Sequence, residues 1–259
     1  MRLKDKVIIV TGGTSGIGRA IAERIVAEGG RVLVHGIERK DGEDVVAQLG
    51  ANAALHLDDL ADIASPARIA AAAGRAFGRI DGIVNNAAIV ARSTLESTTP
   101  EFFERMMAVN LRAPLFLIQA ALPELKKSEG SVLNIGSINA HSGQANLLDY
   151  SLTKGGMQTL SRNLANAHCY DRVRVNHLNV GWVLTDREYH HQIDHGMPTD
   201  WHQHVPEQFA PSGRLISPAE IASAAVYWLG DESRPVSGAV VELEQYSIMG
   251  RNPNKVASK

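Results

Sequence analysis

A tyrosine and a lysine stand four residues apart in the stretch YSLTK, at Tyr150 and Lys154. On a helix this spacing places both side chains on one face. A free phenol has a pKa of about 10 and is a poor base at neutral pH. An ammonium group ~4 Å away, at an effective dielectric constant of ~20, is worth roughly 4 kcal/mol, or about three pKa units. The pair could therefore serve as a general acid and base, although a Tyr/Lys pair by itself is a common surface feature.

A glycine-rich loop, TGGTSGIG at residues 11–18, follows the apolar run Val7–Val10 and precedes a segment with helical periodicity. Glycines let a backbone approach a pyrophosphate closely, and a helix N-terminus offers free N–H groups to phosphates. A P-loop would need Lys and then Ser or Thr after its last glycine. Arg19 and Ala20 stand there instead. The loop therefore favours a dinucleotide site.

Short β-branched segments alternate with longer helical patterns, which predicts a doubly wound parallel α/β sheet with helices on both faces. We expect about seven strands, at 7–10, 31–36, 53–57, 80–86, 131–137, 173–181 and near 240. Helices are expected at 19–28, 40–49, 66–77, 101–127 and 150–168, the fourth kinked at Pro114. No linker or repeat divides the chain, so residues 1–259 form one predicted domain.

Composition and charge exclude several classes of protein. The 26 Lys and Arg against 28 Asp and Glu leave a net charge of −2, which gives no reason to expect nucleic acid or a membrane surface as partner. The N-terminal apolar run is too short for a signal peptide. Cys169, the single cysteine, excludes an intrachain disulfide and is expected to be buried and inert. We predict a cytoplasmic protein.

The spacing Gly12-x-x-x-Gly16-x-Gly18 resembles the dinucleotide fingerprint of the short-chain dehydrogenase/reductase family. Further motifs of that family follow in the expected order: NNAA at Asn85–Ala88, Asn110 within MMAVNLRAP, Ser137 after the fifth strand, Tyr150-x-x-x-Lys154, and NVGWVLT at Asn179–Thr185. The resemblance extends from Val7 to Val241. It implies a Rossmann-like fold, hydride transfer with NAD(H) or NADP(H), and a homotetramer or homodimer.

The resemblance also implies four catalytic roles. Tyr150 is the general acid and base, while Lys154 lowers its pKa and binds the nicotinamide ribose. Ser137 polarises the substrate oxygen. Asn110 holds a water that links Lys154 to solvent. Two simpler interpretations stay open, in which Asn110 is a helix-kink residue and Ser137 a turn residue.

The cofactor contacts implied by the resemblance are Gly12, Thr14, Ser15, Gly16, Ile17, Gly18, Gly36, Asp59, Leu60, Asn86, Ala87, Ala88, Tyr150, Lys154, Val183 and Thr185. Asp58 lies beside Asp59, so the acid that contacts the adenine could be either of these two residues. The sequence departs from the family at Val180, where proline is usual.

The choice between NAD and NADP depends on the end of the second strand. NAD-selective proteins usually carry an acid there to bind the ribose diol. Gly36 occupies that position here and is followed by Ile37, whereas NADP-selective relatives often have Arg. Glu38 is the candidate contact for the ribose, and Arg39 is the candidate contact for a 2′-phosphate. The missing acid slightly favours NADP.

The stretch 186–212 is polar and is expected to be an irregular substrate lid, followed later by a C-terminal tail at 245–259. It contains five histidines: His190, His191, His195, His202 and His204. Their spacing matches no standard zinc site, so we expect no metal. The lid favours a sugar, polyol or hydroxy acid, bound with Ser137, Tyr150, Asn139 and Gln144. A 3-oxoacyl-type carbonyl reductase and a non-catalytic dinucleotide-binding protein are the alternatives.

Overall fold

The computed structural model describes residues 1–248 and contains a seven-stranded parallel sheet in the order β3-β2-β1-β4-β5-β6-β7. The strands are β1 (Val7–Val10), β2 (Arg31–Gly36), β3 (Ala53–Leu57), β4 (Gly82–Asn85), β5 (Ser131–Ser137), β6 (Arg174–Val180) and β7 (Val240–Leu243). The order reverses between β1 and β4. A doubly wound sheet opens a ligand crevice at such a switch point, at the carboxyl ends of its strands.

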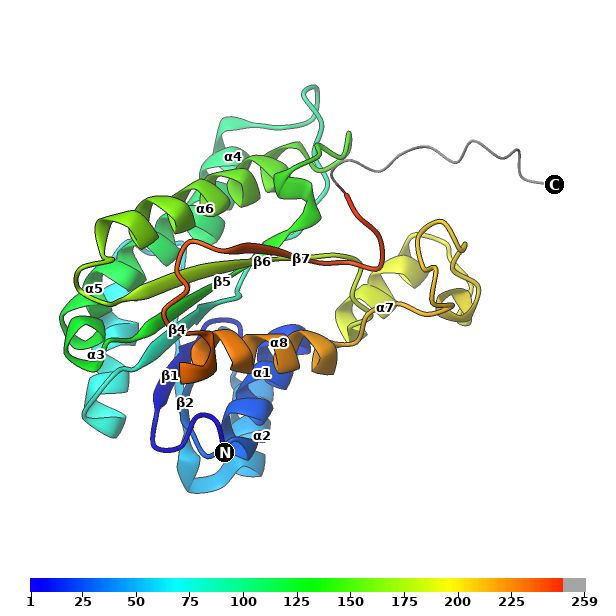
Figure 1. Cartoon of the computed structure of the whole chain (residues 1–259). Coiled ribbons are helices and arrows are strands. Elements are labelled where there is room, and N and C mark those ends of the chain that lie inside the picture. The colour runs from blue at the N-terminus through cyan, green and yellow to red at the C-terminus, as the bar shows by residue number, and fades with distance from the viewer. Residues whose placement is uncertain (249–259) are drawn as a thin grey trace.

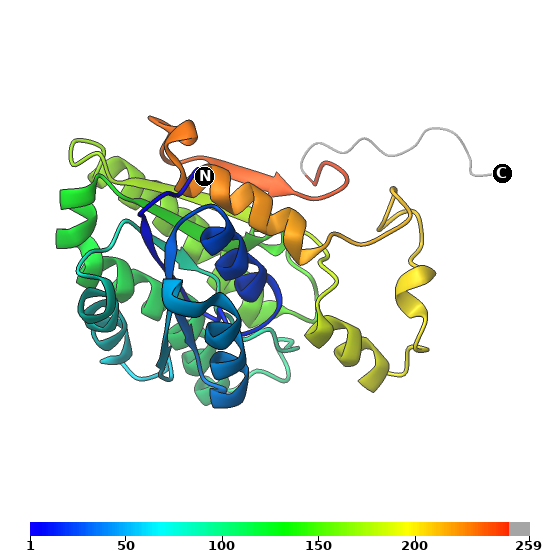
Figure 2. The same ribbon diagram turned by 90° about the horizontal axis from the view of Figure 1, so that it is seen from below.

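Helices cover both faces of the sheet (Figure 1). One layer holds α1 (Gly16–Ala27), α2 (Arg39–Leu49) and α8 (Pro218–Leu229), and α1 lies beside α8 in both views (Figure 2). The other holds α3 (Ser65–Phe77), α5 (Ala113–Ser128) and α6 (Leu148–Ala167). Each layer closes its own hydrophobic core against the sheet. The predicted doubly wound α/β architecture is confirmed, with strand bounds within a few residues.

The predicted helix 101–127 is three segments: α4 (Pro100–Met107), a π-helical turn at Ala108–Arg112, and α5. Pro114 is the second residue of α5, directly after the π-helical turn. The stretch Pro100–Ser128 is long and apolar enough to cross a membrane by length and composition alone. Half of its most apolar window is buried inside the protein, as in a core helix.

The lid segment, residues 186–212, is not wholly irregular. It begins with α7 (Asp186–Asp194) and includes a 3₁₀ turn at Trp201–Gln203. It projects from the body of the protein (Figures 1 and 2). Trp182, in the chain leading into it, stacks on Trp201 with ring centres 5.7 Å apart, and Phe209 meets Trp182 edge-on. The segment therefore has a small apolar core of its own.

Three further points concern Cys169, helix α8 and the C-terminal tail. Cys169 is exposed, not buried, because it lies just beyond the C-terminal end of α6. The sequence analysis omitted α8, although Ser217 and Glu220 form a capping box at its start. Of the predicted tail at 245–259, the residues after 248 lie outside the described part of the chain.

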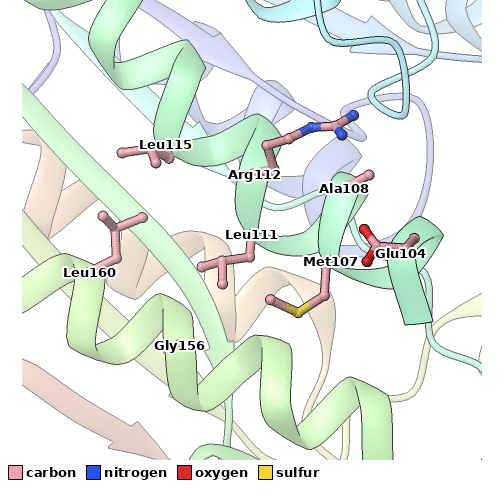
Figure 3. Close-up of a pocket in the computed structure, with 8 residues that line it drawn as sticks. All are labelled: Glu104, Met107, Ala108, Leu111, Arg112, Leu115, Gly156 and Leu160. Atoms are coloured by element: carbon pink, nitrogen blue, oxygen red, sulfur yellow. The ribbon is translucent and has the colours of Figure 1, made fainter. Parts of the chain in front are cut away.

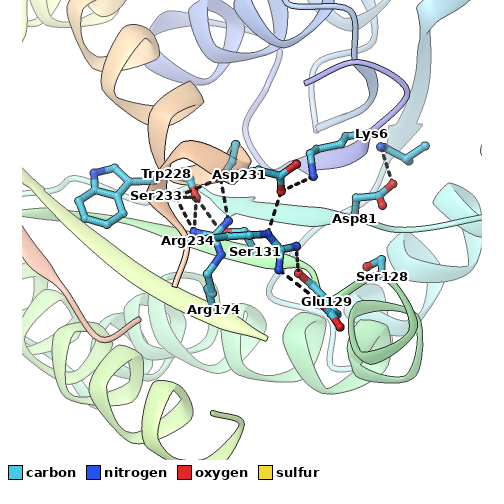
Figure 4. A network of polar contacts seen from close by, with 12 residues as sticks. Lys6, Asp81, Ser128, Glu129, Ser131, Arg174, Trp228, Asp231, Ser233 and Arg234 are labelled. Carbon is cyan, nitrogen blue, oxygen red and sulfur yellow. Dashed lines mark hydrogen bonds and ion pairs between the residues drawn. The ribbon is translucent and has the colours of Figure 1, made fainter. Parts of the chain in front are cut away.

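The amino ends of the strands are tied together by buried and half-buried ionic groups (Figure 4). The Arg174 guanidinium donates to the Trp228 and Gly230 carbonyl oxygens. Arg234 pairs with Glu129 and with Asp231. These contacts fix α8 and the loops at the edge of the sheet opposite to the crevice, so they stabilise the scaffold without taking part in the site.

Candidate active site

Tyr150 and Lys154 lie on one buried face of α6. The Lys154 Nζ lies 5.6 Å from the centre of the Tyr150 ring and donates to the backbone oxygen of Ile135, 2.7 Å away. Tyr150 is 9% exposed and Lys154 2% exposed. The four-residue spacing therefore does bring the phenol and the ammonium together, at the carboxyl end of β5.

The electrostatics of this pair differ from the simple expectation. Burial raises the pKa of Tyr150 to about 12, against the lowering effect of its hydrogen bond with Ser137. Burial also lowers the pKa of Lys154 to about 8. The expected lowering of the Tyr150 pKa is absent in the protein alone, because the Lys154 Nζ lies over the ring while burial disfavours the phenolate. At neutral pH the phenol is thus a proton donor.

Ser137 ends β5 and lies next to Tyr150. Its Oγ accepts a hydrogen bond from the Asn139 N–H at 3.2 Å, and the side chain also bonds to Tyr150. The side chain is buried, with 8% exposed. Ser137 is therefore both the cap of the turn Ile138–Ala140 and a partner of the phenol, so the two interpretations of this residue are compatible.

Asn110 lies within the π-helical turn and is fully buried. Its Oδ1 accepts from the Ile89 N–H at 2.8 Å, and its Nδ2 donates to the Ile89 oxygen and to Thr153 Oγ1. Both amide hydrogens are used by the protein itself. The Asn110 side chain thus fastens the segment after β4 to α6, one turn below Tyr150.

The glycine loop has the geometry of a phosphate cradle. Gly12 and Gly16 have φ values of 61° and 52°, which favour glycine. A Cβ on Gly12 would lie 3.0 Å from Ala87 Cα, so the loop and the chain after β4 are in close contact. α1 begins at Gly16, and Ser15 before it makes no side-chain cap. The first N–H groups of α1 therefore have no capping side chain, as a bound pyrophosphate requires.

The other predicted cofactor residues lie in this loop or next to it. Thr14, within the loop, is only 8% exposed, and Ile17 and Gly18 belong to the first turn of α1. The Asn86 amide donates to the Thr11 and Gly12 oxygens, while the Asn86 and Ala87 N–H groups donate to Thr11 Oγ1. Asn86 thus holds the glycine loop against the chain that continues through Ala88.

The end of β2 leaves no space for an acid. A Cβ on Gly36 would lie 2.5 Å from Thr14 Cγ2, so a side chain there would require the Thr14 side chain to move. At the end of β3, Asp58 forms two 2.7 Å bonds with Arg68. Asp59 is more exposed, and Leu60 next to it is 5% exposed. Asp59 is therefore the freer carboxylate of the two.

The chain after β6 returns to the glycine loop. A Cβ on Gly16 would lie 3.3 Å from the Thr185 methyl. Thr185 also caps α7, with its Oγ1 accepting from Glu188 N–H at 3.1 Å. Val183, 7% exposed, pairs with Ile216 across the base of the lid segment. Val180, in the usual proline position, extends β6 beside Ser137 and Leu243.

The histidines of the lid segment are engaged locally. The Nδ1 atoms of His190 and His195 contact backbone oxygens one helical turn back, and His204 pairs with Asp200. Within residues 1–248, no three His, Cys, Asp or Glu side chains gather as metal ligands would. Asn139 and Gln144 lie at the rim, joined by a 3.5 Å bond.

The sequence analysis missed a buried polar layer beneath the site. Asn179 and His177 of β6 and Gln158 of α6 bond to one another under Ser137, and each is at most 8% exposed. The signal was present in VNHLNV, where polar residues alternate with apolar ones in a strand buried on both faces. A polar residue in such a strand needs an internal partner.

Comparison with known proteins gives consistent results. The family model described as short chain dehydrogenase matches residues 6–194. The short-chain dehydrogenase/reductase FrzI from a Cladobotryum species is 36% identical, over 92% of this chain and 94% of that protein. A 2,5-dichloro-2,5-cyclohexadiene-1,4-diol dehydrogenase from Sphingobium indicum is 32% identical, with 94% and 96% covered.

A solved structure supports the same assignment. The 3-oxoacyl (acyl-carrier-protein) reductase from Agrobacterium tumefaciens, with NADP bound, is similar with a TM-score of 0.85 and 28% identity, over 93% of each chain. Fold, motifs and relatives agree over nearly the whole length. The chain belongs to the short-chain dehydrogenase/reductase family and is an oxidoreductase.

Proposed function

We propose that this protein interconverts a secondary alcohol and a ketone on a polar small molecule, using NAD(H) or NADP(H). The proposal rests on one observation: Ser137, Tyr150 and Lys154 meet at the carboxyl end of β5, beside a glycine loop suited to a dinucleotide. Bound there, the nicotinamide accepts or supplies the hydride. The protein must then handle the proton.

Tyr150 supplies that proton in the reduction. With its pKa raised to about 12, the phenol is protonated at neutral pH and can donate to the carbonyl oxygen of a ketone. The Ser137 hydroxyl lies beside it and donates a second hydrogen bond to the same oxygen. In the oxidation, Tyr150 takes the alcohol proton back, which requires positive charge nearby to stabilise the phenolate.

Lys154 is the protein's source of that charge. Its pKa of about 8 leaves the ammonium charged at pH 7. We propose that this ammonium binds the nicotinamide ribose. A relay water would connect it to solvent through Asn110. Since the Asn110 side chain is occupied by Ile89 and Thr153, we propose that the water binds its backbone carbonyl, in the π-helical turn.

NADP is the cofactor that the end of β2 supports better. Gly36 cannot be replaced by an acid without displacing Thr14, so the usual anchor for an NAD ribose diol has no place. Arg39, at the start of α2 and largely exposed, is our candidate cation for a 2′-phosphate. Steady-state rates with NADPH and NADH test this, and Arg39→Ala should raise the KM for NADPH alone.

The substrate class is a sugar, polyol, diol or hydroxy acid. Asn139 and Gln144 at the rim offer hydrogen bonds to hydroxyl groups, and one relative is named as a diol dehydrogenase. A 3-oxoacyl reductase is the second candidate, because the similar solved structure carries that name. A panel of 2,3-butanediol, ribitol, 3-hydroxybutyrate and acetoacetyl-CoA, followed at 340 nm, separates the two. Clear preference for acetoacetyl-CoA would overturn the polar-substrate proposal.

The catalytic assignment is tested by Tyr150→Phe. Turnover should fall by about 10³-fold, while the dissociation constant for NADPH stays within about twofold. Tyr227→Phe, on the exposed face of α8, is the matched control and should keep full activity. Full activity in Tyr150→Phe would refute the mechanism.

We also propose a cytoplasmic homodimer or homotetramer. An apolar groove of about 420 Å³ lies between α4, α5 and α6 (Figure 3). Met107, Leu111, Leu115 and Leu160 line it, and a second copy of the chain is the partner that the family resemblance implies. Leu111→Asp should shift the oligomer to monomer in light scattering. An unchanged mass would exclude this face as the interface.

A further inference from the structure

Asn179 of β6 uses the full hydrogen-bonding capacity of its side chain. Its Oδ1 accepts from the Ser137 N–H at 3.2 Å and from His177 Nε2 at 2.9 Å. Its Nδ2 donates to Gln158 Oε1 at 2.8 Å and to His141 Nε2 at 2.9 Å. The side chain is completely buried. An amide with both lone pairs and both hydrogens engaged is held in one orientation.

The Asn179 partners are fixed in turn. His177 must carry its proton on Nε2, because Asn179 Oδ1 can only accept. Its Nδ1 contacts Ser161 Oγ at 3.0 Å, and Asn134 donates to that same oxygen. Burial lowers the pKa of His177 to about 4, so this imidazole stays neutral at working pH. The layer therefore connects Ser137 to α6 through Asn179, which bonds to Gln158 directly and to Ser161 by way of His177.

The backbone around Ser137 is adapted to this layer. The register pairs Gly136 with Asn179 across β5 and β6. A Cβ on Gly136 would collide with the His177 imidazole and the Asn179 Oδ1. The absence of a side chain at Gly136 thus lets the amide of Asn179 reach under the strand to the N–H of the next residue, Ser137.

From this geometry we propose that Asn179 is a positioning residue that fixes the Ser137 backbone, and with it the hydroxyl that meets the substrate oxygen. The inference rests on the proposed function of Ser137. The hydrogen-bond partners of the Asn179 side chain within residues 1–248 are Ser137, His177, His141 and Gln158, and neither Tyr150 nor the glycine loop is among them. Its effect passes through one hydrogen bond to the last residue of β5, where small displacements of a reacting group reduce turnover strongly.

The test compares Asn179→Ala with Asn176→Ala. Asn176 lies three residues earlier on β6 and is almost equally buried. Within residues 1–248 its side chain bonds to the Val236 oxygen and the Ala239 N–H. Both variants should lower the melting temperature. Only Asn179→Ala should reduce kcat, by about 10- to 100-fold at an unchanged dissociation constant for NADPH. Only Asn179→Ala should speed hydrogen exchange of the Ser137 amide, by about tenfold or more.

A double-mutant cycle distinguishes positioning from general damage. If Asn179 acts through Ser137, then Ser137→Ala should cost about 100-fold in the parent but only about tenfold or less in Asn179→Ala. Additive losses would overturn the proposal, as would unchanged exchange at Ser137. Failure of the proposed function appears separately, as full turnover in Tyr150→Phe, and the exchange measurement needs no turnover.

A milder variant keeps the test valid if Asn179→Ala does not fold. Gln158→Leu removes one bond that holds Asn179 and leaves the sheet residues intact. It should reduce kcat about threefold and raise exchange at Ser137 measurably. Unchanged values of both quantities in Gln158→Leu would overturn the proposal.

Discussion

The two faces of the sheet beneath the active site carry side chains of opposite polarity. Toward α6, strands β5 and β6 present Asn134, Gly136, His177 and Asn179, joined in a buried polar layer. Toward α8, the same strands present Leu133, Ile135, Leu178 and Val180, which pack in an apolar core. In the proposed mechanism, the polar face orients the groups that transfer the proton, and the apolar face holds the sheet together.

The largest effect on the polar face is expected for Lys154→Met. Turnover should fall by about 10³-fold, because the charge that supports Tyr150 is lost. Stability should rise at pH 7 by about 1–3 kcal/mol, because the lowered pKa of about 8 means that the folded state buries a charge at a cost. This penalty is complete below pH 8 and disappears by pH 10.5.

Urea unfolding of Lys154→Met at pH 7 and pH 10 measures this effect. The gain in stability over the parent should shrink at pH 10. Lys40→Met, at a fully exposed position, serves as control. A Lys154→Met variant that is less stable than the parent at pH 7 would show that the lysine is not strained by burial.

Leu178→Ala makes the matching change on the apolar face. Leu178 is fully buried beside Ile135, and its truncation should cost about 2–4 kcal/mol of unfolding free energy. Because no reacting group depends on it, kcat should stay within about threefold of the parent in the temperature range where the protein is folded. A larger loss of kcat would show that the apolar face also contributes to turnover.

Acid should destabilise the protein through its buried histidines. Burial lowers the pKa values of His35 and His177 to about 4. The unfolded chain takes up protons near pH 6.5 while these residues stay neutral in the fold, so stability falls as the pH drops from 6.5 to 4. At pH 5 the loss is about 2 kcal/mol per histidine.

The unfolding free energy between pH 7 and pH 5 checks this. His177→Gln should remove about half of the pH dependence, whereas His204→Gln, on the exposed lid, should leave it unchanged. An identical slope in His177→Gln would mean that the polar layer already admits water and protons.

The smallest effect is expected where the sheet meets the lid segment. Gln245, after β7, accepts from Ser212 N–H and Oγ and donates to the Arg214 oxygen. These exposed bonds hold the returning end of the lid, so Gln245→Ala should raise the substrate KM about two- to fivefold with little change in kcat. Trypsin should also cleave the Gln245→Ala variant faster at Arg187. An unchanged KM and an unchanged cleavage rate would show that Gln245 does not hold the lid segment.

Sequence patterns predicted the sheet well, because parallel strands buried on both faces leave continuous apolar runs such as VIIV. They did not predict the π-helical turn at Asn110, since one inserted residue leaves the helical spacing almost unchanged. The polar composition of α7 hid a helix with only two apolar residues in the small core around Trp201, namely Tyr189 and Ile193.

The proximity of Tyr150 and Lys154 was predictable from the sequence, but the electrostatics of the pair were not. Spacing places Tyr150 near Lys154, but the depth at which both are buried depends on packing across the whole chain, and burial decides the direction of the Tyr150 pKa. Likewise, the glycine at position 36 could be noticed as a missing acid. That Thr14 excludes any side chain there follows only from the fold.

Two of the three tryptophans, Trp182 and Trp201, stack on each other at the base of the lid segment, and the third, Trp228, lies on α8. Indole emission responds to stacking and to the polarity of its surroundings. The protein thus carries a built-in fluorescent reporter, and a ligand that shifts the lid will change its emission without any attached dye. Replacing Trp228 by Phe would leave a signal from that segment alone.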